Sequence, residues 1–316
     1  MKHPEFKPPL GLRGGGVQTI VGSTVRKYFV SRRAESLKAS ESEHILTADD
    51  GTRLAVWLSE QAQPAPLIIL IHGWLGTHNS GYNLSLANTL WENGFSVARL
   101  NLRDHGGTAH LNKEMFHNGL IHEVVDVVGQ LQSRFDRTAV IGFSLGGNFA
   151  LRLSKHLGMP ALGICPLMDP AASVAVIDKG ANVYKGYFMR KWRKAMDDKA
   201  AAFSDKYNFV ETGAYGLKTV HLMTQHFVDH YTDYDSLQAY YDCYTLTGTY
   251  LEGTASAILA AADDPVVPEQ GFVGLPDSVA LTLLPRGGHC AFVDSYAMTS
   301  FADQFASDHC KRLFSS

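Results

Sequence analysis

The sequence lacks several features that mark large classes of protein. Its 316 residues include only 4 cysteines, which are far apart and form no CxxC pair, so neither a zinc site nor a disulfide framework is expected. These cysteines are Cys165, Cys243, Cys290 and Cys310. The longest apolar run, at 67–71, cannot span a bilayer, and residues 1–16 hold no apolar stretch long enough for a secretory signal. We therefore expect a soluble, cytoplasmic protein with no transmembrane segment and with reduced, mostly buried thiols.

An excess of charge of one sign is also absent. Lysine and arginine number 28 and aspartate and glutamate 31, which gives a formal net charge of -3, and no basic block occurs. This balance does not indicate a basic surface that would bind nucleic acid, so a small neutral or weakly charged ligand is favoured. Among 14 histidines, four recur between residues 105 and 122 without cysteine or carboxylate partners at ligand spacing. No metal site is expected.

What the sequence does contain is a repeated alternation of apolar runs of strand length with helical segments. The run at 67–72 is followed by a helical stretch at 81–94, and the alternation of predicted strands and helices continues to about residue 166. Because strands joined by helices are connected by right-handed crossovers, the pattern predicts an α/β fold with a doubly wound, mostly parallel sheet. Asp50-Gly51, before the first run, predicts a hairpin. The other predicted strands are at 95–101, 138–142, 161–166, 255–263 and 279–285, and the last helix is at 295–310.

The alternation stops after residue 169 and resumes near residue 253. We predict an α/β core from residues 41–169 and 253–316, with a helical cap at 170–252 inserted between them. Residues 1–40, rich in Gly, Pro and basic residues, are expected to form an extended arm. Within the cap, an apolar stripe at helical spacing is expected mainly to pack the cap on the core, with lining of a substrate pocket as the alternative. The stripe comprises Val220, Met223, Phe227, Tyr231 and Tyr234.

The segment TAVIGFSLGGNFALRL at 138–153 places Ser144 between two glycines, after a buried strand and before a helix. A bare G-x-S-x-G is a weak signal, but a strand-turn-helix setting is the one that a nucleophile elbow requires. Gly142 and Gly146 are needed because side chains there would collide with neighbouring backbone in so tight a turn. The free N–H groups of the following helix favour negative charge beside the serine. Ser144 is therefore predicted to be a nucleophile.

A serine nucleophile needs a base within hydrogen-bond reach and a carboxylate to orient that base. His289 follows a predicted strand and is preceded by glycines in RGGHCAF, and Asp264 follows another strand in AADDPVVP. Both are placed where strands end, in the order serine, acid, histidine that is expected for this elbow. We predict His289 as the base and Asp264 as its partner. Asp263 is the fallback, and Asp169 is a further candidate that a capping role explains equally well.

Two backbone donors are also needed for the oxyanion that forms when Ser144 attacks a carbonyl. The N–H of Leu145 follows the nucleophile at the start of the helix. A second donor should come from the loop HGWLG at 72–76, in which the Trp74 N–H is best placed. His72 is expected to brace this turn rather than to transfer protons.

These motifs together resemble the α/β-hydrolase superfamily. HGWLG, NLRDHGG, GFSLGGN, DDPVVP and GGHCAF occur in the superfamily's order, over nearly all of the chain outside the predicted cap. The segments GLRGGGVQTI and CPLMDP, with residues 101–128, are similar to the branch that holds the bacterial YheT-type predicted hydrolases and the mammalian ABHD1/2/3-type esterases and phospholipases. The resemblance implies the α/β-hydrolase fold and action on esters with acyl chains.

The sequence therefore leads to the hypothesis of a serine carboxylester hydrolase for small to medium acyl esters. It would act through an acyl-serine intermediate, need no cofactor, and lose activity as the pH falls through a histidine pKa of about 6.5, adjusted by Asp264. Two alternatives stay open: a thioesterase, lipase or peptidase with the same triad, and a ligand-binding protein of the same fold that turns over negligibly. The expected partner is a small-molecule ester, and the oligomeric state is left open.

Overall fold

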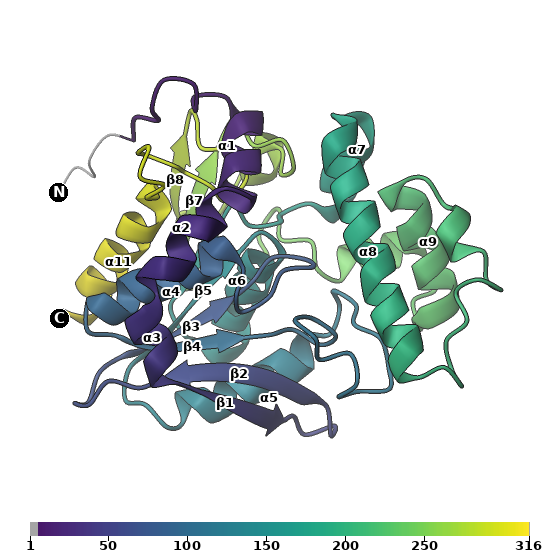
Figure 1. The fold of residues 1–316 in the computed structure, drawn as a ribbon, viewed down its shortest axis with the longest axis horizontal. Helices are drawn as coiled ribbons and strands as arrows, with labels where there is room; N and C mark the ends of the chain where they lie inside the picture. Colours follow the sequence, from purple (N-terminus) through teal and green to yellow (C-terminus); the bar gives the residue numbers. More distant parts are fainter. Residues whose placement is uncertain (1–5, 316) are drawn as a thin grey trace.

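An eight-stranded sheet forms the centre of the computed structural model, which describes residues 6–315 (Figure 1). The strand order is β1-β2-β4-β3-β5-β6-β7-β8. β1 and β2 form the hairpin predicted around Asp50-Gly51, β2 pairs antiparallel with β4, and the later pairs are parallel. The strands are β1 (Glu41–Thr47), β2 (Arg53–Ser59), β3 (Leu67–Ile71), β4 (Ser96–Leu100), β5 (Thr138–Phe143), β6 (Ala161–Ile164), β7 (Ser256–Ala261) and β8 (Ala280–Leu284). This doubly wound, mostly parallel sheet confirms the predicted fold class.

Alternate residues of the central strands face two separate apolar layers. In β3, Ile69 and Ile71 belong to the layer formed with α5 and α6, whereas Ile68 and Leu70 belong to the layer formed with α4 and α11. Every residue of β3, β4 and β5 is buried, because helices cover both faces of the sheet. These helices are α4 (Gly81–Glu92), α5 (Ile121–Gln132), α6 (Leu145–Leu157) and α11 (Phe301–Phe314). The carboxyl ends of the parallel strands consequently lie along one edge of the sheet.

The N-terminal segment differs from the extended arm predicted from its glycines and prolines. It forms three helices, α1 (Gly15–Ser23), α2 (Arg26–Arg33) and α3 (Glu35–Ser40). Val30 and Leu37 are buried in the same apolar layer as α4, and Arg26 is buried in an ion pair with Asp303 of α11. Burial against the core therefore stabilises helices that the local pattern did not indicate. A smaller difference concerns the last helix, which begins at residue 301 and not at 295.

Four helices occupy the insertion between β6 and β7. They are α7 (Pro170–Lys179), α8 (Asn182–Ala202), α9 (Val220–Tyr231) and α10 (Leu237–Asp242). Figure 1 shows α7, α8 and α9 packed side by side, to the right of the sheet. On α9, Val220, Met223 and Phe227 are buried, and Val220 and Phe227 also line a cavity. The packing predicted for the stripe is confirmed for Val220, Met223 and Phe227, which share one apolar cluster with residues of the core, whereas Tyr234 lies beyond the end of α9. That the cavity takes a substrate stays a prediction. No helix within residues 6–315 is both long and apolar enough to cross a membrane.

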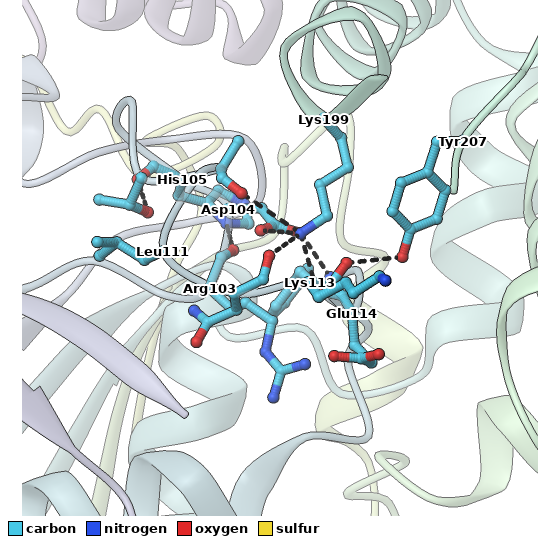
Figure 2. Close-up of polar contacts among 12 residues, drawn as sticks. Arg103, Asp104, His105, Leu111, Lys113, Glu114, Lys199 and Tyr207 are labelled. Carbon is cyan, nitrogen blue, oxygen red and sulfur yellow. Dashed lines mark hydrogen bonds and ion pairs between the residues drawn. The ribbon is translucent and has the colours of Figure 1, made fainter. Parts of the chain in front are cut away.

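A buried lysine connects the inserted helices to the rest of the protein. Lys199, near the end of α8, extends its ammonium group into the loop that follows β4 (Figure 2). Its Nζ lies 2.9 Å from a carboxylate oxygen of Asp104 and donates to the carbonyl oxygens of Asn112 and Glu114 at 2.6 and 2.9 Å. Burial lowers the pKa of Lys199 and raises that of Asp104, and the opposite charge of each partner counteracts these shifts. The ion pair thus holds α8 against this loop.

Replacing Lys199 by Met is expected to destabilise the fold strongly. The Asp104 carboxylate would stay buried without a counter-ion, and breaking a buried pair in this way costs about 3–5 kcal/mol. Urea unfolding would measure the loss as a lower midpoint. Lys194→Met on the same helix is the matched control, because the exposed pair of Lys194 with Asp198 should contribute little. An unchanged midpoint for Lys199→Met would contradict the role of this pair, as would failure of an added Asp104→Asn substitution to recover stability.

Candidate active site

Ser144 occupies the turn between β5 and α6 in an unusual backbone conformation. Its φ of 55° and ψ of -118° are strained for a residue with a side chain, and α6 begins at the next residue. A Cβ atom on Gly142 would lie 1.9 Å from the carbonyl oxygen of Gly146, and one on Gly146 would lie 2.2 Å from that of Ile71. Only glycine fits at both positions, in agreement with the collision expected from the sequence. The tight turn places Ser144 at the carboxyl end of β5.

The structure brings His289 and Asp264 together at the same edge of the sheet. His289 Nδ1 lies 2.8 Å from Asp264 Oδ2, and the two side chains are 11% and 2% exposed. The other carboxylate oxygen of Asp264 accepts the backbone N–H groups of Val266 and Val267 at 2.8 and 3.0 Å. These bonds fix the carboxylate, which in turn holds the proton on Nδ1 and leaves Nε2 as the acceptor nitrogen. Ser144 and His289 line one cavity.

Two opposing effects shift the pKa of His289. Burial disfavours the imidazolium form and lowers the pKa, whereas the negative charge of Asp264 beside Nδ1, and after it the neighbouring Cys290, raise it. The pKa of His289 consequently lies well above the ordinary histidine value. The imidazole is a neutral base only above this raised pKa. The pH dependence expected from the sequence, centred on about 6.5, therefore moves upward.

The two alternative carboxylates have other partners. Asp263 Oδ1 accepts the N–H of Gly288 at 2.9 Å and so fixes the loop that carries His289. Asp169 accepts the N–H of Ala172 at 2.9 Å and forms the N-cap of α7. Asp169 thus has the capping role that the sequence left as its alternative. Of the three aspartates, Asp264 is the one hydrogen-bonded to the imidazole.

The loop at 72–76 and the start of α6 place two backbone N–H groups near Ser144. Within residues 6–315, no hydrogen bond is found for the N–H of Trp74 or of Leu145, and both residues line a cavity with Ser144. Leu145 is the first residue of α6, where helix geometry leaves N–H groups unpaired. The positive end of the helix favours negative charge at this position. These are the two donors that the sequence predicts for an oxyanion.

Two buried histidines shape the loop that carries the first of these donors. His72 Nδ1 donates to the Gly73 carbonyl oxygen at 2.8 Å, and its Nε2 accepts the N–H of Leu102 at 3.2 Å. His105 Nε2 accepts the N–H of Leu75 at 3.1 Å. Burial lowers the pKa of His72 well below the ordinary value and that of His105 to about 4, so both neutral rings can accept these bonds. His72 therefore braces the turn, and His105 is a positioning residue that sequence reasoning missed, although the NLRDHGG motif contains it.

Two cavities meet at Ser144. The first, of about 110 Å³, lies against α7, α8 and α9 and is lined mainly by apolar and aromatic side chains. The second, of about 480 Å³, is a groove between α1 and the first half of α8, and it also borders His289. Ser144, Trp74, Phe188 and Val266 line both cavities. The rings of Trp74 and Phe188 stack with their centroids 5.5 Å apart, so an aromatic pair lies where the two cavities join.

The N-terminal helices support the site in a way that the sequence did not indicate. The hydroxyl oxygen of Thr19, on α1, accepts the backbone N–H of His289 at 2.8 Å. Gly15 lies so close to Asp263 that a Cβ atom there would be 1.9 Å from the Asp263 carbonyl oxygen. Helix α1 is therefore packed directly on the loops that carry the imidazole and the carboxylates. The glycine run at 14–16 is the feature of the sequence that could have indicated this close packing. A glycine run, however, does not specify which segment of the chain packs against it.

The sequence matches the model of the alpha/beta hydrolase family over residues 68–304. The chain belongs to the alpha/beta hydrolase family. This alpha/beta hydrolase is 24% identical over 312 residues to a protein of Escherichia coli (strain K12) named "Putative esterase YheT", with 92% of this chain and 87% of that protein covered. A Haemophilus influenzae protein named "Putative esterase/lipase" is 27% identical over 128 residues, or 40% of this chain and 39% of that one. The resemblance to YheT-type hydrolases predicted from the motifs is thereby confirmed.

Solved structures of other hydrolases share the fold of this alpha/beta hydrolase. The Pyrococcus furiosus esterase Pf2001 matches with a TM-score of 0.55 at 14% identity, with 88% of this chain and 95% of that chain covered. A membrane phospholipase A described as a bacterial virulence factor matches with a TM-score of 0.56 at 16% identity, with 95% and 96% covered. At such low identities, the likeness is one of fold alone.

Proposed function

We propose that this alpha/beta hydrolase is a serine carboxylester hydrolase with Ser144, His289 and Asp264 as its catalytic triad. The observation that carries the proposal is the 2.8 Å contact of Asp264 with His289, beside the cavity that Ser144 and His289 share. A serine hydroxyl is a weak nucleophile at neutral pH unless such an oriented base accepts its proton. The family and the esterase names of its curated relatives fit this proposal.

Each group has a defined role in the proposed reaction. His289 Nε2 removes the proton from the Ser144 hydroxyl as its oxygen attacks the ester carbonyl, and Asp264 stabilises the imidazolium that results. The N–H groups of Leu145 and Trp74 donate to the oxyanion. His289 then protonates the leaving alcohol, and a water molecule activated by the same imidazole hydrolyses the acyl-serine. No step requires a cofactor.

The two cavities favour an ester with an acyl chain of small to medium length. The cavity of about 110 Å³ against α7, α8 and α9 is the smaller of the two and would take the acyl chain, with Ile177 and Phe227 among its lining. The wider groove beside α1 would take the alcohol. On this proposal, residues 170–252 act as a cap that sets acyl specificity, while residues 41–169 and 253–316 form the core that carries the chemistry.

A series of p-nitrophenyl esters with increasing acyl length tests this proposal. Since each buried CH₂ contributes about 0.8 kcal/mol, kcat/KM is expected to rise by about fourfold at most per added CH₂. It should then fall once the cavity of about 110 Å³ is full. Steady-state kinetics over the series would locate the maximum. A rise that continues through long chains would contradict the small-to-medium preference and indicate a lipase.

The two alternatives give different results in the same assay. A thioesterase or peptidase would hydrolyse a thioester or anilide of the same acyl group faster than the oxygen ester. A ligand-binding protein of this fold would release at most one slow equivalent of p-nitrophenol per chain. Sustained turnover of the oxygen ester, with the thioester and anilide slower, is the result that we expect.

A further inference from the structure

Two of the four cysteines meet beside the imidazole of His289. The backbone N–H of Cys290 donates to Cys165 Sγ at 3.4 Å, although the two residues are 125 positions apart in the sequence. Both thiols are buried and free. One ligand atom from each of Cys165, Cys290 and His289 lies within 4.8 Å of the other two. The proposed ester hydrolysis uses neither thiol.

The fold keeps the two cysteines in place at some conformational cost. Cys165 and Cys290 have φ values of 44° and 61°, in the left-handed region that residues with side chains rarely adopt. Cys165 Sγ also contacts the carbonyl oxygen of Gly288 at 3.6 Å, so this thiol lies against the loop that carries His289. The positions of both thiols are thus fixed by backbone that belongs to the site itself.

Two thiols and an imidazole are ligands that Zn²⁺ and related thiophilic cations prefer. In a tetrahedral site, with Zn–S of about 2.3 Å and Zn–N of about 2.0 Å, the ligand atoms lie roughly 3.5 Å apart. The atoms of this cluster, at no more than 4.8 Å, are close to that spacing, so modest side-chain shifts would close it. Two thiolates also cancel both charges of the ion, which favours its burial.

The groove between α1 and α8 gives an ion a route to these ligands. Cys290 and His289 both line this cavity of about 480 Å³. Cys165 is fully buried, and its Sγ accepts the N–H of Cys290. An ion that enters the groove therefore meets the imidazole and one thiol first, and the second thiol completes the ligand set.

We propose that Cys165, Cys290 and His289 form an inhibitory site for a thiophilic divalent metal ion such as Zn²⁺. The ion takes the place of one proton on each thiol, two protons pass to the solvent, and a fourth position is left for water. A metal on Nε2 prevents His289 from accepting the Ser144 proton, and a metal on Nδ1 separates the imidazole from Asp264. This inhibitory effect rests on the proposed function, whereas the binding itself does not.

Cadmium is the probe for binding, because each cadmium–thiolate bond adds a charge-transfer absorbance in the ultraviolet. One equivalent of Cd²⁺ added to the full chain is expected to produce this absorbance. One equivalent of Zn²⁺ is expected to stop hydrolysis of a p-nitrophenyl ester, and EDTA to restore it. Mg²⁺ prefers oxygen ligands and should have neither effect.

Cys165→Ser separates the metal site from the catalytic groups. The serine hydroxyl can still accept the Cys290 N–H, so ester hydrolysis should persist. Cd²⁺ binding should weaken by more than about 100-fold, since even the loss of an outer-shell partner costs about 10–100-fold. Cys243→Ser removes a half-buried thiol from the insertion and is the matched control, expected to leave metal sensitivity unchanged. If Cys165→Ser does not fold, loss of the cadmium absorbance in Cys290→Ser decides instead.

Three results would overturn the metal site: no added absorbance with stoichiometric Cd²⁺, full sensitivity in Cys165→Ser, or loss of sensitivity in Cys243→Ser. Failure of the proposed function would give a different result from failure of the metal site. If the chain binds Cd²⁺ but the metal-free protein hydrolyses no ester, the metal site stands and the proposed hydrolase activity is refuted.

Discussion

Replacing Ser144 by Ala is expected to reduce ester hydrolysis by about 10⁴- to 10⁶-fold. The substitution removes the oxygen that forms the acyl intermediate, while the backbone donors of Trp74 and Leu145 and the two cavities stay in place. Substrate binding should therefore change little, and the loss should fall on kcat rather than on KM. The strained backbone at residue 144 is the same for Ala as for Ser, so the fold should persist.

The Ser144→Ala experiment needs a second serine as its control. Ser154 lies on the same helix α6, is buried, and borders neither cavity, so Ser154→Ala should retain nearly full activity. A fluorophosphonate probe should label the wild type and Ser154→Ala but not Ser144→Ala. Labelling of Ser144→Ala at the wild-type rate would show that another residue is the nucleophile.

Replacing Asp264 by Asn is expected to lower kcat by about 10⁴-fold and to move the acid limb of the pH profile. In the wild type, the pKa of His289 is raised well above its ordinary value, despite burial, by the Asp264 carboxylate. The active form is the neutral imidazole, so wild-type kcat/KM should rise with pH through a value above about 6.5. Without the carboxylate the imidazolium loses its stabilisation, so the acid limb of Asp264→Asn should lie at lower pH while the maximum rate falls.

The neighbouring aspartate provides the control for this prediction. Asp263 accepts the N–H of Gly288 through one carboxylate oxygen, and the amide oxygen of Asp263→Asn can accept the same bond. This variant should keep the wild-type pH profile and lose no more than about tenfold in rate, because it removes no partner of the imidazole. Matched kcat/KM profiles of wild type, Asp263→Asn and Asp264→Asn make the measurement. A larger loss of kcat/KM for Asp263→Asn than for Asp264→Asn would contradict the assignment of Asp264 and indicate that Asp263 orients the imidazole.

Patterns short enough to lie within one or two elements were predicted correctly from the sequence. The hairpin around Asp50-Gly51, the parallel strands and the strand-turn-helix at Ser144 all depend on residues that are neighbours in the chain. The glycines at 142 and 146 also belong to this group, because the collisions that they avoid arise within the turn and against the adjacent strand β3. Each of these features follows from side-chain periodicity or from backbone sterics, which act locally.

The sequence by itself determined the order of strands and helices in the α/β core, the tight turn at Ser144 and the strand ends that carry Asp264 and His289. Only the tertiary structure decided that α1 is a helix whose Thr19 bonds to His289 across 270 positions, and that Cys165 meets Cys290 across 125. The physical reason is that these contacts depend on how separate elements pack, and a packing partner far along the chain leaves no periodic pattern in either segment.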